Sequence, residues 1–216
     1  GSIGVVGGDS GHTGDSNPAP VTGMAAVSNP LASVIPPDPT KLTCTAGGTL
    51  TGSVGPAVAG GTVCYSGNVT LKNVTLRQGT FVFTGNVTLS GSITSGTGGS
   101  TIDIDSGALS ISTGTTLALI APTTGTYSGI ALMEPVTNTN QITIQKGDAS
   151  GSITGIIYAP SAELFLQDSG GDKSGGLTLV TDLIVGTLFD KTATLSLQSY
   201  SSVVPSSPLV KVALVE

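Results

Sequence analysis

Charge, histidine and tryptophan are scarce in this chain of 216 residues. Charged residues make up 9% of it, with one histidine and no tryptophan, whereas an average soluble domain is about 25% charged. The seven basic residues are scattered and the net charge is −6, so the chain repels polyanions and we expect no nucleic acid partner. No run approaches the roughly 20 apolar residues of a membrane-spanning helix.

The chain nevertheless has enough apolar surface to fold, because 38% of its residues are hydrophobic and its mean hydropathy is +0.34. Its 32 glycines therefore indicate tight turns rather than disorder. Residues 1–40 carry six of the twelve prolines, and proline cannot donate to a continuous strand ladder. We predict an extended Pro/Gly-rich arm over 1–40, either loose or laid along the side of the folded part, and one domain over 41–216.

A repeat dominates that domain: the pentapeptide GNVTL at 67–71 returns at 85–89. Short runs in which Thr or Ser alternates with aliphatic residues indicate strands with one face in a core. Further runs lie at 62–65, 73–76, 80–83, 101–105, 108–112, 116–120, 130–132, 141–145, 153–158, 163–167, 177–180 and 194–198.

Three such runs make a turn of about 18–24 residues, which is typical of repeats that stack. The predicted fold class is all-β: a single-stranded parallel β-helix, or β-solenoid, right-handed by the usual preference of parallel crossovers. Asn68 and Asn86 occupy matched positions and are expected to stack. The segment 209–216 is predicted to be a final strand, and the arm and residues 187–208 are candidates to cover the open ends of the coil.

Cys44 and Cys64 lie about one turn apart, so stacking can bring them side by side. A disulfide between them is favoured over two buried thiols, since their spacing is not that of a metal site. A disulfide implies an oxidising compartment.

Acidic residues are catalytic candidates, because polysaccharide-cleaving enzymes often use this architecture. Asp103 and Asp105 alternate with isoleucines, which places both on one outward face, roughly 7 Å apart, a separation that suits an inverting glycosidase. A solvated face explains the pair better, since no third acid, base or histidine lies nearby in the sequence.

Other polar residues have simple interpretations too. Asp168 and Asp172 flank a glycine-rich loop that is able to hold calcium, but the segment fits no known calcium repeat and is interpreted as an excursion from the coil. His12, the single histidine, is interpreted as solvated, and Glu134 and Glu163 as surface acids. We predict no enzymatic activity, no catalytic residue, no metal and no cofactor.

Outward threonines suggest a further alternative, ice binding. Such faces usually repeat T-x-T on every turn, whereas T-x-T in this chain, as at 192–194, does not recur once per turn. The outward threonines of the strand runs are single: Thr70, Thr75, Thr88, Thr143 and Thr178.

Several phrases resemble the C-terminal extracytoplasmic region of bacterial TadG-like proteins, which are associated with Tad (Flp) pili and described as putative pilus-assembly proteins. The strongest are A-P-x-x-G-x-Y-x-G-I at 121–130 and G-x-I-Y-A-P at 155–160, and the likeness extends over 29–216. The resemblance implies a bacterial cell-surface context and a hydrophobic segment preceding such a region. Membrane anchoring is thus expected only through a segment outside this sequence.

These observations predict a non-enzymatic extracytoplasmic structural or adhesion module of a pilus-associated or cell-surface protein. Its expected partners are other surface or pilus components, or glycans. The main alternative is a carbohydrate-binding or polysaccharide-cleaving β-helix. Scarce aromatic residues disfavour it, because sugar sites commonly stack on exposed rings.

Overall fold

A computed structural model describes residues 3–4, 20–23, 28–145, 149–167, 177–191 and 196–198. Almost all of the described secondary structure is β, as predicted. The one helical element is the 3-10 turn η1 (Pro39–Lys41), and a two-residue parallel pair joins β1 (Ile3–Gly4) to β2 (Pro20–Val21). Among the described residues no helix has the length and apolar character to span a membrane.

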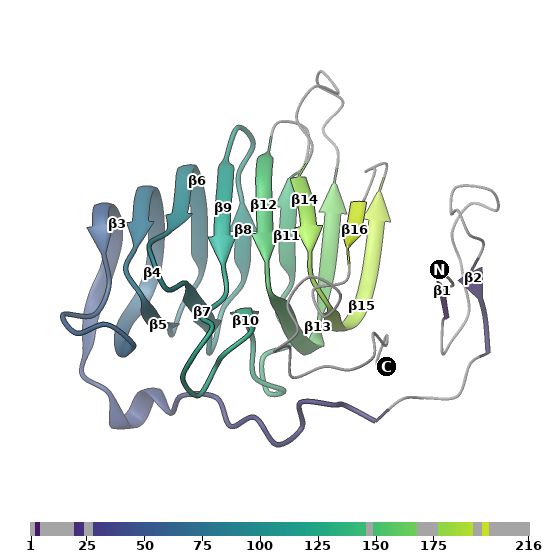
Figure 1. The fold of residues 1–216 in the computed structure, drawn as a ribbon, viewed down its shortest axis with the longest axis horizontal. Helices are drawn as coiled ribbons and strands as arrows, with labels where there is room; N and C mark the ends of the chain where they lie inside the picture. The colour runs from purple at the N-terminus through teal and green to yellow at the C-terminus, as the bar shows by residue number, and fades with distance from the viewer. Residues whose placement is uncertain are drawn as a thin grey trace.

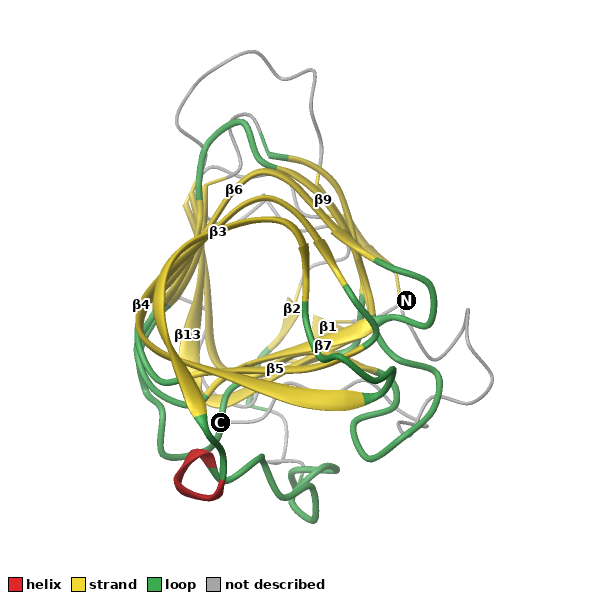
Figure 2. Ribbon diagram, turned by 90° about the vertical axis from the view of Figure 1, so that its left-hand side faces the viewer, coloured by secondary structure: helices red, strands yellow, loops and turns green. Residues whose placement is uncertain are grey.

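The predicted β-solenoid is confirmed, with about 6 stacked turns. Every pairing in its 14-stranded sheet is parallel and joins one coil to the next (Figure 1). Seen along the stack, each coil is a three-sided ring (Figure 2). We call the three sides faces A, B and C, in the order in which the chain traverses them.

The strand registers assign each strand to a face. β3 (Cys44–Val54) and β4 (Gly61–Leu76) each run around all three faces. Face A continues with β5 (Gly79–Phe83), β7 (Ser100–Ile104), β10 (Ile130–Met133) and the first parts of β13 (Ile156–Gln167) and β15 (Leu183–Lys191). Face B continues with the first part of β6 (Val87–Ser95), β8 (Leu109–Ile111), β11 (Ile142–Gln145) and the last parts of β13 and β15. Face C continues with the last part of β6, β9 (Thr116–Ile120), β12 (Ser150–Thr154), β14 (Leu177–Val180) and β16 (Ser196–Gln198).

Coil length changes along the solenoid. One column of matched residues on face A contains positions 44, 64, 82, 103, 133, 158 and 184. The first three spacings, 20, 18 and 21 residues, agree with the predicted turn of 18–24. The later ones, 30, 25 and 26, exceed it because longer connections interrupt those coils.

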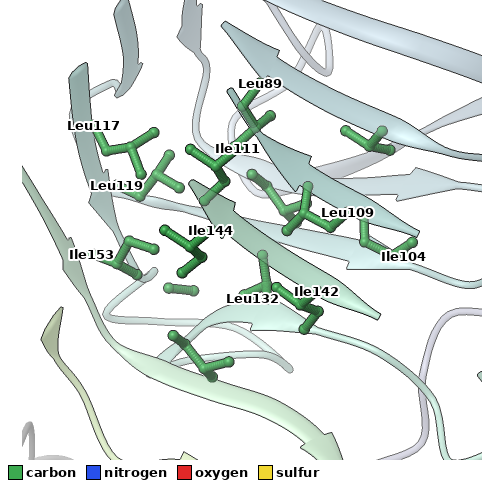
Figure 3. Packing of buried hydrophobic residues seen from close by; sticks show 14 of the residues in the cluster. Leu89, Ile104, Leu109, Ile111, Leu117, Leu119, Leu132, Ile142, Ile144 and Ile153 are labelled. Carbon is green, nitrogen blue, oxygen red and sulfur yellow. The ribbon is translucent and has the colours of Figure 1, made fainter. Parts of the chain in front are cut away.

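Aliphatic side chains fill the bore of the solenoid. Val69, Val87, Leu109, Ile142 and Leu164 form one inward column on face B, and all are buried. Leucines and isoleucines from the three faces meet in the centre (Figure 3). This burial is the main stabilising contribution, about 1.5–3 kcal/mol for each large aliphatic side chain.

Face A departs from the expected pattern of one buried and one solvated side. Every residue of β5, β7 and β10 is buried. The outer side of this face carries a second apolar cluster, made of Leu31, Ile130, Met133, Ile156, Tyr158 and Ile184. The arm contributes Leu31, so face A lies between the bore and the arm.

The two asparagines stand on matched positions of neighbouring coils, as predicted. The backbone N–H of Asn86 donates to Asn68 Oδ1 (3.2 Å), and that of Ala108 donates to Asn86 Oδ1 (2.9 Å). Each amide therefore bonds the backbone of the next coil at this corner.

Some expectations about boundaries were wrong. The run 153–158 is two strands, because Gly155 (φ 138°) makes a corner between β12 and β13. The described arm lies along the side of the solenoid, on face A, which is one of the two courses expected for it, and it does not cover an open end. Residues 187–191 and 196–198 are strands rather than a cap. The strand predicted at 209–216 lies outside the described residues.

Gly151 is a position where a side chain is expected to damage the stack. It has φ 97°, and a Cβ there would overlap the carbonyl oxygen of Leu117 in the preceding coil. We expect Gly151→Ala to lower the free energy of unfolding by about 3 kcal/mol, through backbone strain and steric overlap. Urea denaturation measures this loss.

Gly114 provides the matched control, because it also has a positive φ (73°) but open space around its Cα. Gly114→Ala should cost only the strain, about 1 kcal/mol. Equal losses at the two sites would contradict the close coil contact at Gly151.

Candidate functional site: buried carboxyl groups beneath the arm

Residues 28–43, the described end of the arm and the three residues that connect it to β3, run along the outside of face A, from the later coils towards β3 (Figure 1). Asn29 Nδ2 donates to the Tyr158 hydroxyl (2.9 Å), and the Tyr127 hydroxyl donates to the Ile35 carbonyl (2.9 Å). The arm then turns through η1, capped by Asp38, before it enters the first coil. The arm thus covers much of one column of outward residues on face A.

Asp103 belongs to that covered column, where its neighbours are Val82 and Met133. Its side chain is fully buried, and neither carboxyl oxygen has a hydrogen-bond partner. Burial raises the pKa of Asp103 to about 8, and the nearby Asp105 carboxylate adds to the rise. Asp103 is therefore a neutral carboxylic acid at pH 7.

Glu134 is a second buried acid, at the end of β10. It is fully buried, and both of its carboxyl oxygens lack hydrogen-bond partners. Burial raises the pKa of Glu134 to about 9, with a further contribution from the charge of Asp103. The interpretation of Glu134 as a surface acid was wrong. Side chains two residues apart on a strand point to the same side, and Glu134 lies two residues after the core residue Leu132. This spacing argued against a solvent-exposed Glu134.

The groups around Asp103 are mostly acidic or aromatic. Burial raises the pKa of Asp105, and Asp38 of the arm raises it further. Burial also raises the pKa of Tyr127, with a contribution from Asp103. Lys41 forms an ion pair with Asp38 (3.0 Å) and is itself highly exposed. This part of face A therefore disfavours additional negative charge.

This arrangement corrects the picture of Asp103 and Asp105 as a pair on a solvated face. The two residues do lie on the outer side of face A, but Asp103 is fully buried there, and it interacts electrostatically with Tyr127, which packs against the apolar cluster that includes Leu31 of the arm. Asp105 is half-buried. A buried, neutral Asp103 has no access to a polysaccharide, so the pair does not form a glycosidase site in this arrangement.

The disulfide predicted between Cys44 and Cys64 is present. It joins β3 to β4 across matched positions, with a Cα–Cα distance of 4.4 Å. Glu163 accepts a hydrogen bond from Gln141 and is partly exposed. His12, Asp168 and Asp172 lie outside the described residues.

In the part of the chain that the structure describes, no three His, Cys, Asp or Glu side chains come together as a metal site would require. A surface hollow of about 320 Å³ is lined by residues of the first three coils, none of them acidic. These residues are Pro56, Ala57, Ala59, Thr75, Arg77, Gln78, Gly96 and Thr97.

Comparison of the chain with protein-family models, curated proteins and solved structures finds no match. The candidate site therefore rests on the geometry of the chain alone. Its defining feature is a pair of orphaned, buried carboxyl groups, Asp103 on the outer side of face A and Glu134 directly after β10.

Proposed function

We propose that this chain is a non-enzymatic structural or adhesion module that acts outside the cytoplasm, as part of a pilus-associated or cell-surface bacterial protein. The resemblance to TadG-like proteins suggested this context, and the physical character of the solenoid supports it. A stack of coils joined by strand ladders forms a stiff body that holds apart whatever is attached to its ends.

The disulfide is the observation that carries the proposal. A terminal coil has only one neighbour, so a solenoid begins to fray at its ends. Cys44 and Cys64 connect the first two coils at that point. Disulfides persist in oxidising compartments and are rare in the bacterial cytoplasm, so a covalently closed end suits a module outside the cell membrane.

The outer side of face B is suited to weak, repeated contacts. A single row of hydroxyl side chains crosses five successive coils at strand spacing: Thr49, Thr70, Thr88, Ser110 and Thr143. Many weak contacts along one rigid surface add up to useful avidity. The proposed partners are therefore pilus or surface components, or glycans, that present repeated polar groups.

Immunogold labelling of intact cells of the source bacterium tests the proposed location. We expect antibodies against the purified chain to label the outside of unpermeabilised cells and to label pili above background. Labelling that appears only after permeabilisation would contradict the proposal.

A polysaccharide panel separates the proposal from the carbohydrate-cleaving alternative. Purified protein is incubated with a glycan array and with soluble polysaccharides, and reducing ends are measured. We expect binding without turnover or no binding. Reproducible release of reducing ends, lost in Asp105→Asn, would favour an enzyme.

A further inference from the structure

The arm is held to face A by few contacts. Leu31 is the one fully buried side chain among residues 28–43, and Val34 is partly buried against the same cluster. The side-chain hydrogen bonds described between the arm and the solenoid are those of Tyr158 and Tyr127. Short, sparsely packed segments of this kind open at a much lower free energy than the core does.

The arm also makes no continuous ladder with the sheet beneath it. Four of its residues in this stretch are prolines, at positions 30, 36, 37 and 39, and proline has no N–H to donate. The backbone hydrogen bonds that it does make are local, such as Val34 N–H to the Leu31 carbonyl (2.9 Å) and Leu42 N–H to the Pro39 carbonyl (3.1 Å). The arm can therefore detach without breaking the parallel ladders.

Asp103 lies in the outward column of face A next to Met133, which belongs with Leu31 of the arm to the outer apolar cluster. The residues on either side of it in β7, Ile102 and Ile104, belong to the core of the bore. An ionised carboxylate must gain water or hydrogen-bond donors, and Asp103 has no donor in contact. Water can reach it from the outer side of face A with less disruption than through the packed bore.

We propose that residues 28–43 form a latch over face A, that the uncharged carboxyl group of Asp103 keeps it closed, and that ionisation of Asp103 releases it. Release would uncover the apolar outer surface made of Ile130, Met133, Ile156, Tyr158 and Ile184. This conformational device goes beyond the structural role proposed above and does not depend on it.

The charged groups around Asp103 act in the same direction. Asp105 directly follows β7, Glu134 directly follows β10, and Tyr127 lies in the loop before β10; each interacts with Asp103 electrostatically. On the arm, Asp38 interacts with Asp105, and Lys41 is paired with Asp38. Ionisation of Asp103 thus adds a negative charge near Asp105, which already interacts with the acidic Asp38 of the arm.

The latch opens towards high pH. Asp103 holds its proton up to about pH 8 in the closed state, whereas an exposed aspartate loses it near pH 4. The closed latch with protonated Asp103 is therefore favoured at low pH. Each pH unit between these two pKa values favours the open state by a further factor of about ten, and the effect levels off above about pH 8, where Asp103 is ionised in both states.

Alkylation of an engineered thiol measures the opening directly. Leu31→Cys places a thiol at the buried point of the arm, and Ser33→Cys places one at an exposed point of the same arm. The native cysteines are joined in the disulfide and do not react. The ratio of the two iodoacetamide rates cancels the pH dependence of thiol ionisation and reports how accessible position 31 is.

We expect the ratio of the alkylation rate at position 31 to that at position 33 to rise at least tenfold between pH 6.5 and pH 9.5 when the cysteine variants retain Asp103. The far-UV circular dichroism should stay unchanged over this range. In an Asp103→Asn background the ratio should remain at its low-pH value. Asp103→Val, which matches the neighbouring Val82 of the column, serves as a second neutral variant if the asparagine variant folds poorly. Glu163→Gln, on the exposed side of face B, should behave like the parent.

A ratio that does not change with pH in the Asp103 background would overturn the proposal. So would an equal rise in the neutral variants, because the opening would then not depend on Asp103. Loss of the circular dichroism signal in step with the labelling would also overturn it, since that result would indicate global unfolding rather than release of the arm.

Discussion

Asp103→Asn is expected to raise the melting temperature by several degrees at pH 8 and to weaken the fall in stability that the parent shows with rising pH. In the folded protein burial raises the pKa of Asp103 to about 8, against about 3.9 in an unfolded chain. Between these values the folded state binds a proton that the unfolded state has lost. The free energy of unfolding therefore decreases as pH rises through this window.

The expected size of this effect is large for one residue. Each pH unit in the window costs on the order of 1 kcal/mol per buried acid, and Glu134, with its pKa raised to about 9, acts in the same sense. The stabilising contribution of these two protonated acids is complete below about pH 4 and is progressively lost up to pH 8–9. About 2–4 °C of melting temperature corresponds to each kcal/mol in a chain of this size.

Thermal denaturation from pH 4.5 to pH 8.5 makes this measurement, with Glu163→Gln as the matched control on an accessible acid. The control should follow the parent at every pH. Stability that is flat or rises across this range in the parent would show that Asp103 and Glu134 are not buried as neutral acids. The double variant Asp103→Asn, Glu134→Gln should have the flattest profile of the set.

Reduction of the disulfide is expected to lower the melting temperature by about 6–12 °C. Closing a loop of the 20-residue separation between Cys44 and Cys64 is worth about 3 kcal/mol in the chain-entropy model, and the same conversion to melting temperature applies. Scanning calorimetry with and without a thiol reductant measures the shift. The loss should begin in β3, because the first coil then has only its strand ladder to hold it.

The variant Cys44→Ser, Cys64→Ser controls for effects of the reductant itself. It should melt at the temperature of the reduced parent and be insensitive to reductant. An unchanged melt, together with two titratable thiols in the untreated protein, would show that the bridge does not form in solution.

The sequence predicted the type of fold because its repeat and its period are both local. The GNVTL pentapeptides fall on matched positions of β4 and β6, and their V-T-L alternation identifies the valine and the leucine as the inward residues of face B. The order of the coils then follows, because a single chain that winds into a parallel β-helix stacks its coils in sequence order. The disulfide could be predicted for the same reason, because Cys44 and Cys64 are separated by about one coil and therefore lie on matched positions.

Face A could not be predicted in this way. Its burial on both sides depends on the arm, whose path across distant coils is not encoded in any local period. TIDID at 101–105 looks like a half-solvated strand, whereas all of β7 is buried, and Leu31 and Tyr127 pack on the outer side of the same face. The first coil was also partly missed, because CTAGGTLTGSV has too few aliphatic residues to mark β3 as a strand. DLIVGTLFD, which contains most of β15, was missed because a glycine corner divides it.

The central claim, that coils stack in the register described, is tested most directly by pairwise cysteine cross-linking on face B. Thr70 and Thr88 are matched on adjacent coils, and Ser110 is matched to Thr88 one coil further. Adjacent strands are about 4.8 Å apart, within the Cα range of a disulfide, whereas two coils are not. Thr70→Cys with Thr88→Cys should oxidise readily to an intramolecular disulfide, and Thr70→Cys with Ser110→Cys should not. Efficient closure of the 70–110 pair, or failure of the 70–88 pair, would contradict the stacked coil.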